Sequence, residues 1–441
     1  MTEGRIRDLG DGLIIRHGTS EDADALVRFN KAVHGENEWD EKGLADWTLD
    51  LIGGEGPTFE PGDFIIVEDT TTGEIVSTCC LISQTWAYEG IPFKVGRPEL
   101  VGTKKEYRRR GLVRQQFEIL HEWSEDRGEL VQVITGIPYY YRLFGYEMAL
   151  NLQGGRYGFE PNLPTLAEEQ EEPFSFRPAD DGDISFLMSV YARGCKRQLI
   201  SAVWDEAQWR YELGGKRKYN INRREIYIIQ DQADNPVGVI GIPPIKWGNN
   251  SCLTIYEIAP EVSWAAVTPS VARFLWQKGL ELAKEQDQPQ SAFGFWLGEA
   301  HPAYEVIASR LPVVIKPYAY YVRVPHPAKF IKEIAPALEA HLSDSAFANY
   351  TGEIKLNFYR DGLLMTFKDG HLEKIKSLSN TELDKPTVNF PPLVFLHLLF
   401  GHRNMDELSH IFADCGTRRD ENKRLLDTLF PKRSSDIWSI S

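Results

Sequence analysis

One stretch of the sequence, Arg97–Tyr146, reads RPELVGTKKEYRRRGLVRQQFEILHEWSEDRGELVQVITGIPYYYRLFGY and decides the fold. It predicts an apolar strand, a basic turn ending in glycine, an amphipathic helix, a second strand over residues 130–135 and a short helix closed by Gly145. The unpaired N–H groups and the dipole at a helix start favour an anion, and arginine matches the geometry of phosphate oxygens. The stretch therefore predicts an α/β unit with a phosphate-binding turn.

The basic turn stands out because the chain as a whole is acidic. Arg108, Arg109, Arg110 and Arg114 lie close together in a protein of formal net charge -15. An acidic balance argues against general nucleic-acid binding and is compatible with cationic substrates such as amines. The 5 cysteines show no CxxC pair and no His/Cys cluster with metal spacing, so no metal is expected. No apolar run reaches the ~18–20 residues of a membrane span, and the N-terminus lacks a secretory signal, so a cytoplasmic protein is expected.

The length of 441 residues favours several domains, and the sequence divides into three segments. The first covers residues 1–160 and ends at a linker rich in proline and acid. The second, residues 174–325, begins like the first, because Arg177 and Asp183 repeat the spacing of Arg16 and Asp22. Where the first segment has its basic glycine turn, the second has Trp264–Pro269, so the second segment is expected to lack a cofactor.

The third segment, residues 326–441, has a different pattern. A helix is expected over residues 328–342, followed by strands over 352–358, 362–368 and 370–375 that are joined by Asp-Gly turns. Helices over residues 392–399, 405–412 and 421–429 complete it. This pattern predicts an α+β module, and the chain as a whole is expected to be mixed α+β (α/β).

Two short motifs resemble those of a known family. The spacing Arg108-x-x-Gly111-x-Val113 resembles the acyl-CoA signature Q/R-x-x-G-x-G/A of GCN5-related N-acetyltransferases (GNAT), with Val113 as a departure, and Tyr141–Tyr146 fits the pattern Y-x-x-F-G-Y. Tandem GNAT folds followed by a sterol-carrier-like domain resemble the Eis-like acetyltransferases. The resemblance implies a GNAT N-acetyltransferase that moves an acetyl group from acetyl-CoA to a primary amine, such as an aminoglycoside, a polyamine or lysine. It also implies a homohexamer.

The resemblance implies roles for particular residues. Backbone groups of Val101, Gly102 and Thr103 would hold the pantetheine and the acetyl carbonyl, and the pyrophosphate would lie on Arg108, Arg109, Gly111, Leu112, Val113 and Arg114. Tyr141 matches the general-acid tyrosine, which protonates the departing thiolate. In the family the terminal carboxylate accepts the proton of the amine, so Ser441 takes this role here, although family members often end on an aromatic residue. No Gly-x-Ser-x-Gly elbow or Cys/His pair suggests an acyl-enzyme, so direct transfer in a ternary complex is expected.

Further expectations come from the residues themselves. Glu36 and Trp39 lie between the first two expected helices, and carboxylates with an aromatic ring favour a cationic acceptor. His34 is expected at the surface, and Tyr139, Tyr140 and Tyr146 as a packed aromatic cluster with His397 packed elsewhere. Two alternative functions remain: an apolar-ligand-binding protein that uses the third segment, with the GNAT folds as scaffold, and an acyltransferase that uses another acyl-CoA.

Overall fold

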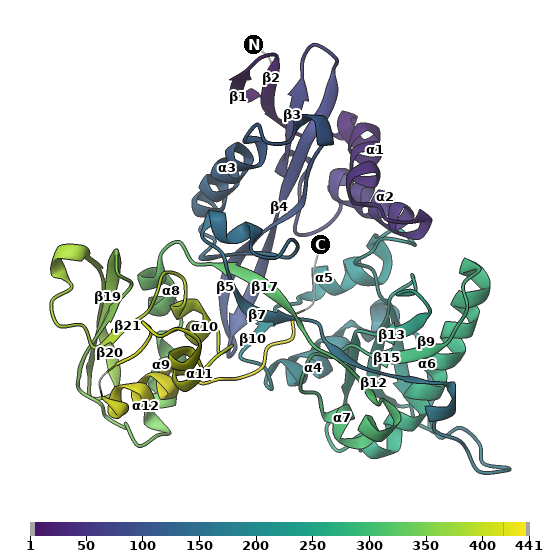
Figure 1. Ribbon diagram of the computed structural model, residues 1–441. Coiled ribbons are helices and arrows are strands. Elements are labelled where there is room, and N and C mark those ends of the chain that lie inside the picture. Colours follow the sequence, from purple (N-terminus) through teal and green to yellow (C-terminus); the bar gives the residue numbers. More distant parts are fainter. Residues whose placement is uncertain (1–4, 418, 438–441) are drawn as a thin grey trace.

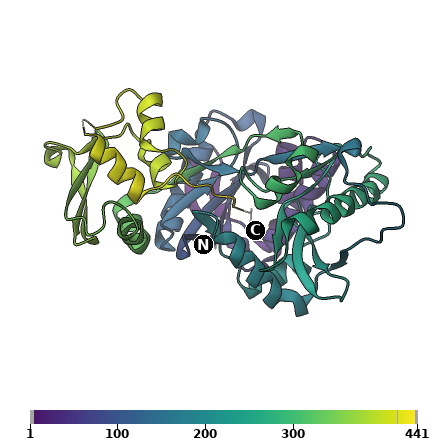
Figure 2. The same cartoon turned by 90° about the horizontal axis from the view of Figure 1, so that it is seen from below.

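The computed structural model describes residues 5–417 and 419–437, which form three units (Figure 1). The first unit lies at the top of that view, the second at the lower right and the third at the lower left. Seen from below, the third unit again lies to one side of the other two (Figure 2). The first two units carry the site, and the third supplies the end of the chain.

A nine-stranded sheet forms the centre of the first unit, in the order β1-β2-β3-β4-β5-β6-β17-β7, with β10 paired to β4. Helices α1 and α2 lie on one side of this sheet and α3 on the other (Figure 1). The expected strand–turn–helix–strand order around the basic turn is confirmed. The elements are β1 (Arg5–Gly10), β2 (Leu13–His17), α1 (Ala23–His34), α2 (Glu38–Gly53), β3 (Phe64–Asp69), β4 (Glu74–Tyr88), β5 (Ile91–Thr103), α3 (Leu112–Asp126), β6 (Val131–Ile134), η4 (Tyr140–Phe144), β7 (Glu147–Leu152), β10 (Ile200–Ala202) and β17 (Tyr318–Arg323).

The first and second units exchange strands. Strand β17 follows the second unit in sequence but enters the first sheet between β6 and β7. In return, β8 (Gly155–Phe159) leaves the first unit and pairs with β15 (Ala292–Phe295) and β16 (Val313–Ile315) of the second. The sequence places β8 before residue 160 and β17 before residue 325, so each sheet contains a strand from the other segment.

The second unit contains two four-stranded sheets, ordered β14-β12-β11-β9 and β13-β15-β8-β16. Its long helix α6 begins at Trp264, so Trp264–Pro269 is helical and the turn that precedes the helix is Ala259–Ser263. That turn carries Glu261 and no arginine. The remaining elements are β9 (Ser175–Pro178), α4 (Ile184–Cys195), α5 (Glu206–Arg210), β11 (Glu225–Gln230), β12 (Pro236–Ile242), β13 (Asn250–Leu253), β14 (Ile255–Ile258), α6 (Trp264–Gln286) and α7 (Pro302–Ile307).

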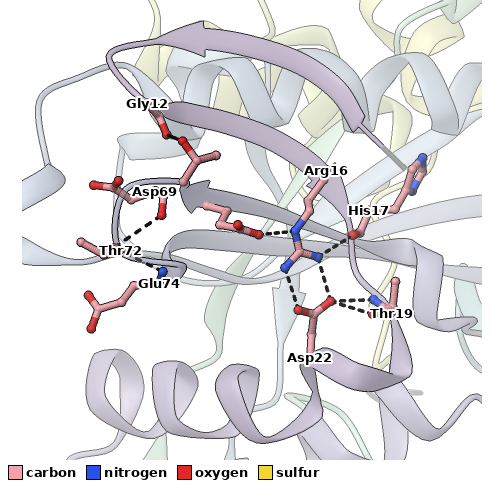
Figure 3. A network of polar contacts seen from close by, with 10 residues as sticks. Gly12, Arg16, His17, Thr19, Asp22, Asp69, Thr72 and Glu74 are labelled. Carbon is pink, nitrogen blue, oxygen red and sulfur yellow. Dashed lines mark hydrogen bonds and ion pairs between the residues drawn. The ribbon is translucent and has the colours of Figure 1, made fainter. Parts of the chain in front are cut away.

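The same ion pair opens both units. In the first unit, Arg16 Nη2 lies 2.7 Å from Asp22 Oδ1, and Asp22 also accepts a hydrogen bond from the N–H of Thr19 (Figure 3). In the second unit, Arg177 Nη2 lies 2.7 Å from Asp183 Oδ1. The hydrogen bond from Arg177 lowers the pKa of Asp183 below its ordinary value. The pair fixes the turn between the opening strand and the first helix of each unit.

The third unit is an α+β module whose sheet has the order β20-β19-β18-β21. The expected helix over residues 328–342 is two helices that meet at Ile334, and the expected strands and helices are otherwise present with shifted ends. The elements are α8 (Pro327–Glu333), α9 (Ala335–Ser343), β18 (Gly352–Asn357), β19 (Asp361–Lys368), β20 (His371–Ser379), β21 (Val388–Asn389), α10 (Phe395–Leu399), α11 (Met405–Ile411) and α12 (Asp420–Leu429).

One apolar core joins the third unit to the other two. It extends from Trp86 on β4 through Ile200 on β10 to Phe330 and Leu398 in the third unit, and it also takes in Ile437 near the end of the described chain. Burial of apolar surface on this scale holds the units together. Within the described residues, helices long and apolar enough to span a membrane are absent.

Candidate active site

The site begins where two parallel strands separate. Strands β5 and β6 pair only at Val95–Val131 and Gly96–Gln132 and then diverge. Beyond that point β5 contains a bulge, since three steps along it, from Glu99 to Gly102, face two steps along β4. A bulge leaves an unpaired residue and bends the strand. The divergence and the bulge together open a gap in the sheet beside Leu100 and Val101.

Gly102 allows the first helix to pack closely against the bulge. A Cβ atom at this position would lie 2.8 Å from Val33 Cγ1 and 3.1 Å from His34 Nε2. His34 is therefore half-buried against β5, and the expectation that it lies at the surface is wrong. Its Nε2 has no hydrogen-bond partner within the described chain, and burial lowers the pKa of the imidazole.

Substitution of Gly102 is predicted to destabilise the first unit. We expect Gly102→Ala to lower the free energy of unfolding by about 1–3 kcal/mol, because overpacking forces neighbouring atoms to move. The measurement is chemical denaturation. Gly53→Ala is the matched control, since a Cβ atom there meets no heavy atom within 4 Å. Equal stability of the two variants would contradict the packing role.

The basic turn connects the end of β5 to the start of α3. Gly111 is the residue before the helix and has φ 77°, a left-handed conformation that favours glycine. Arg108 Nε donates to the carbonyl of Thr103 at 3.2 Å, which holds the turn against the strand end. Arg109 and Arg114 are exposed and form no ion pair within the described residues. The turn therefore presents free cations and helix N–H groups on one surface, which fits the binding of a phosphate.

Two neighbours of the turn differ in their surroundings. Leu112 is buried in the core between the sheet and α3, so only its backbone is placed to meet a ligand. Arg110 lies 3.6 Å from Asp11 and also over the ring of Tyr107, so part of its charge is already compensated.

Tyr141 lies in the short helix η4, which follows strand β6. It is 5% exposed and its ring contacts those of Phe117 and Tyr321, at 5.9 and 5.6 Å between centroids. Burial, with the charge of Glu99, raises the pKa of the Tyr141 phenol well above its ordinary value. The phenol therefore stays protonated at neutral pH, which is the form that a general acid needs.

The other tyrosines divide into two kinds. Tyr146 is fully buried and its hydroxyl lies 2.9 Å from His121 Nε2, in agreement with the expected packed cluster. Tyr140 is half-buried and packs against Phe144. Tyr139 is 71% exposed, so the expectation that it packs in this cluster is wrong. Its left-handed backbone, φ 64°, turns the side chain outward, while its N–H donates to the hydroxyl of Tyr321.

A buried ion pair in the gap was missed by the sequence analysis. Arg97 Nε donates to Glu99 Oε1 at 2.8 Å, and the two side chains are 4% and 13% exposed. Two residues apart on one strand, they share a face of the sheet. The sequence indicates such a pair only by its two charged residues at alternate positions of an otherwise apolar strand. Glu99 is a carboxylate close enough to Tyr141 to affect its pKa.

Trp39 and Glu36 lie at the start of α2. Asn37 caps this helix, and its side chain accepts hydrogen bonds from the N–H groups of Trp39 and Asp40. Trp39 and Asp40 line a cavity of about 320 Å³, which Trp247 of the second unit also lines. Glu36 is exposed and outside this lining. Burial, with the charge of Glu36, raises the pKa of Asp40.

Ser441, the expected base, lies outside the described residues. The last described residue is Ile437, which is 2% exposed. Within the described residues no group of three or more His, Cys, Asp or Glu side chains is arranged to hold a metal ion.

Comparisons with known proteins identify the first unit. Residues 14–149 match the family model for an acetyltransferase (GNAT) domain. No curated protein matches the chain. Among solved structures, a probable N-acyltransferase from Enterococcus faecalis V583 superposes with a TM-score of 0.64 at 11% identity, covering 97% of this chain and 100% of that one.

Two other solved structures agree along almost the whole chain. A GCN5-related N-acetyltransferase from Kribbella flavida gives a TM-score of 0.63 at 14% identity, covering 97% of this chain and 100% of that one. Eis1 from Mycobacterium abscessus gives 0.58 at 13% identity, covering 96% and 98%. At these identities the likeness shows the fold. With the family match, it follows that the first unit is a GNAT acetyltransferase domain and that the protein is an acyltransferase enzyme.

Proposed function

We propose that the protein transfers an acetyl group from acetyl-CoA to a primary amine by direct transfer in a ternary complex. One observation carries the proposal: the basic turn follows the end of β5 and the buried Tyr141 follows the end of β6, the two parallel strands that diverge to open the gap. A phosphate site after one strand and a proton donor after the other fit a CoA thioester that lies between them.

The chain supplies separate groups for each part of the cofactor. Exposed Arg109 and Arg114, with the first N–H groups of α3, would hold the pyrophosphate. Backbone groups of Val101 and Thr103, beside the bulge, would hold the pantetheine and the acetyl carbonyl. Acetyl-CoA supplies the thioester carbonyl and a thiolate leaving group.

Proton transfers have to accompany acetyl transfer. An alkyl ammonium has a pKa of about 10.4 in water, so a base must take one proton before the nitrogen attacks. We assign this role to the terminal carboxylate of Ser441. Tyr141 then donates its phenolic proton to the departing sulfur, and the second proton, which the nitrogen loses as the amide forms, restores the phenol.

Glu99 is a second candidate for the base. Its carboxylate is already in the gap, close to Tyr141, which favours it. Against it, Glu99 Oε1 accepts from both Nε and Nη2 of Arg97, at 2.8 and 2.7 Å. The Arg97 guanidinium therefore already occupies this oxygen, and the ion pair would have to open before Oε1 could receive the proton.

The acceptor would approach from the side of α2. The cavity of about 320 Å³ presents Trp39 and Trp247 with the carboxylate of Asp40, and an aromatic face with a carboxylate attracts a cation. Glu36, exposed just before α2, would add negative charge nearby. An aminoglycoside, a polyamine and a lysine side chain all carry a primary ammonium group, which these aromatic and carboxylate side chains would favour.

The architecture supports a duplicated GNAT fold. Residues 1–160 form the catalytic copy, 174–325 a second copy without cofactor, and 326–441 a sterol-carrier-like domain. The repeated Arg–Asp pair and the reciprocal exchange of β8 and β17 support the duplication. A homohexamer in the cytoplasm is part of the proposal, and light scattering tests its mass.

An apolar-ligand-binding function is less well supported. A cavity of about 960 Å³ in the third unit has charged side chains in its lining, among them Glu353, Lys385, Asp414 and Arg419. An apolar ligand would leave these groups without water.

An acceptor screen tests the proposal. Kanamycin, spermidine and Nα-acetyl-lysine are each incubated with acetyl-CoA or octanoyl-CoA, and released CoA is measured with a thiol reagent. Release that depends on both an amine and acetyl-CoA supports the proposal. Release with octanoyl-CoA alone, or with none of the amines, contradicts it.

The basic turn gives a prediction for cofactor affinity. We expect Arg109→Ala and Arg114→Ala each to weaken acetyl-CoA binding by about tenfold or more, because each removes a charge-assisted hydrogen bond of about 1.5–3 kcal/mol. Isothermal titration calorimetry measures the Kd. Arg28→Ala, which removes an exposed arginine from α1, controls for net charge. Equal Kd values for all three variants would place the pyrophosphate elsewhere.

A further inference from the structure

The chain segment after α12 binds along residues 196–200, between α4 and β10. The N–H of Leu199 donates to the carbonyl of Ser434 at 3.0 Å, and the N–H of Ile200 donates to Ser435 Oγ at 3.1 Å. Arg433 donates from Nη2 to the carbonyl of Lys196 at 2.6 Å. The segment is therefore fixed by backbone and side-chain hydrogen bonds before it reaches Asp436.

Asp436 enters a gap in the second unit. Together with Glu257 and His301 it lines a cavity of about 30 Å³, which is large enough for a water molecule and too small for a cofactor. Gly298 makes room for it, since a Cβ atom there would lie 3.2 Å from Asp436 Cβ. His301 Nε2 lies 3.0 Å from the carbonyl of Tyr256 on β14 and so bridges the gap on its other side.

This gap has the same place in the topology as the cofactor gap of the first unit. Strands β13 and β15 run parallel, as β5 and β6 do, and the chain then leads into α6 and α7 as it leads into α3 and η4. Counting from the last paired residues, Gln132 and Phe295, the counterpart of Tyr141 is Tyr304, whose hydroxyl donates to the carbonyl of Phe295 at 2.8 Å. With Asp436 in this space, the second unit uses it for the end of its own chain.

The charges around Asp436 connect it to the catalytic unit. Glu257 accepts from Arg197 at 2.5 Å, while its other oxygen has no partner within the described residues. Burial, with the charge of Glu257, raises the pKa of Asp436 to about 7, and Arg224 opposes this rise. Arg224 is also within electrostatic reach of Arg97, in the gap of the first unit. Asparagine has the shape of the neutral carboxyl form of Asp436 and carries no charge, so it can replace that form.

We propose that the gap between β14 and residues 296–301 is a receptor for the C-terminal segment, and that Asp436 is a positioning residue that directs the terminal carboxylate toward the first unit. This rests on the proposed role of that carboxylate as the base. Ser441 follows five residues after Asp436, and five extended residues reach at most about 18 Å, so a shift at Asp436 moves the end of the chain.

Release of the tail is the direct test, and it does not depend on activity. The full-length protein is treated with carboxypeptidase Y, and loss of C-terminal residues is followed by intact mass. We expect Asp436→Ala to speed this loss by about tenfold, with Asp436→Asn close to the wild type. Asp384→Ala removes an exposed carboxyl of the third unit and serves as the control. Equal rates for Asp436→Ala and the control would overturn the anchoring role.

Kinetics then connects the anchor to the reaction. We expect Asp436→Ala to lower kcat by about tenfold or more and leave the KM for acetyl-CoA unchanged, because misplacing a catalytic group affects the chemical step. Asp436→Asn should restore kcat. A variant lacking residues 438–441 separates the two ideas. If that variant keeps full activity, the base assignment fails, and the carboxypeptidase result still decides the anchor. If it is inactive while Asp436→Ala is fully active, the positioning role fails.

Discussion

Replacing Tyr141 by phenylalanine should lower kcat by about 10²–10³-fold and leave the KM for acetyl-CoA within about twofold. Loss of a positioned general acid costs rates of this order. The ring of Tyr141 fills the space between Phe117 and Tyr321, and phenylalanine keeps that packing. The change therefore removes the proton and little else. Steady-state kinetics with the best acceptor of the screen measures both constants.

The control and the pH profile make this test specific. Tyr140→Phe removes a neighbouring hydroxyl and should keep near-normal activity, since Tyr140 is half-buried against Phe144. Burial raises the pKa of Tyr141, so the protonated fraction is complete at neutral pH and falls only in strong alkali. Wild-type activity should show no alkaline loss from this group below about pH 10. Full activity of Tyr141→Phe would assign the acid to another group.

The strand, turn and helix around Gly111 could be predicted from the sequence because the information there is local. A strand, an arginine-rich turn and a glycine at the start of a helix determine one another's geometry within a few residues, and Gly111 has the left-handed φ that such a turn needs. The same holds for the Arg16–Asp22 turn and its repeat at Arg177–Asp183. Short-range patterns of this kind can be recognised in a single sequence.

What depends on distant contacts was not predictable. The burial of His34 depends on Gly102, far along the chain, which lets α1 approach the bulge. The place of β17 in the first sheet depends on pairing with β6 across a separation of many residues. Arg97 and Glu99 stand at alternate positions of β5, but the local sequence does not show that both side chains are buried. The alternation of residue types along a strand shows which side chains share a face. It does not show what packs against that face.

Removing residues 438–441 should lower kcat by about 10²–10⁴-fold at neutral pH, with the fold intact. The reason is that the amine arrives as an ammonium, and without a base only a small fraction is neutral. Ile437 remains, so the apolar core that joins the units keeps its contact with the tail. Thermal unfolding should therefore match the wild type within about 2 °C.

The same experiment distinguishes the terminal carboxylate from other bases. Loss of the base raises the pH at which activity appears, because the free amine then has to form in solution, so the truncated protein should recover activity as the pH approaches the pKa of the acceptor. Ser441→Ala keeps the carboxylate and should be fully active. A single glycine added after Ser441 displaces the carboxylate by about 3.5 Å and should lower kcat strongly. If the truncated protein is fully active and Glu99→Gln is inactive, the base is Glu99, and the ion pair with Arg97 must open during the reaction.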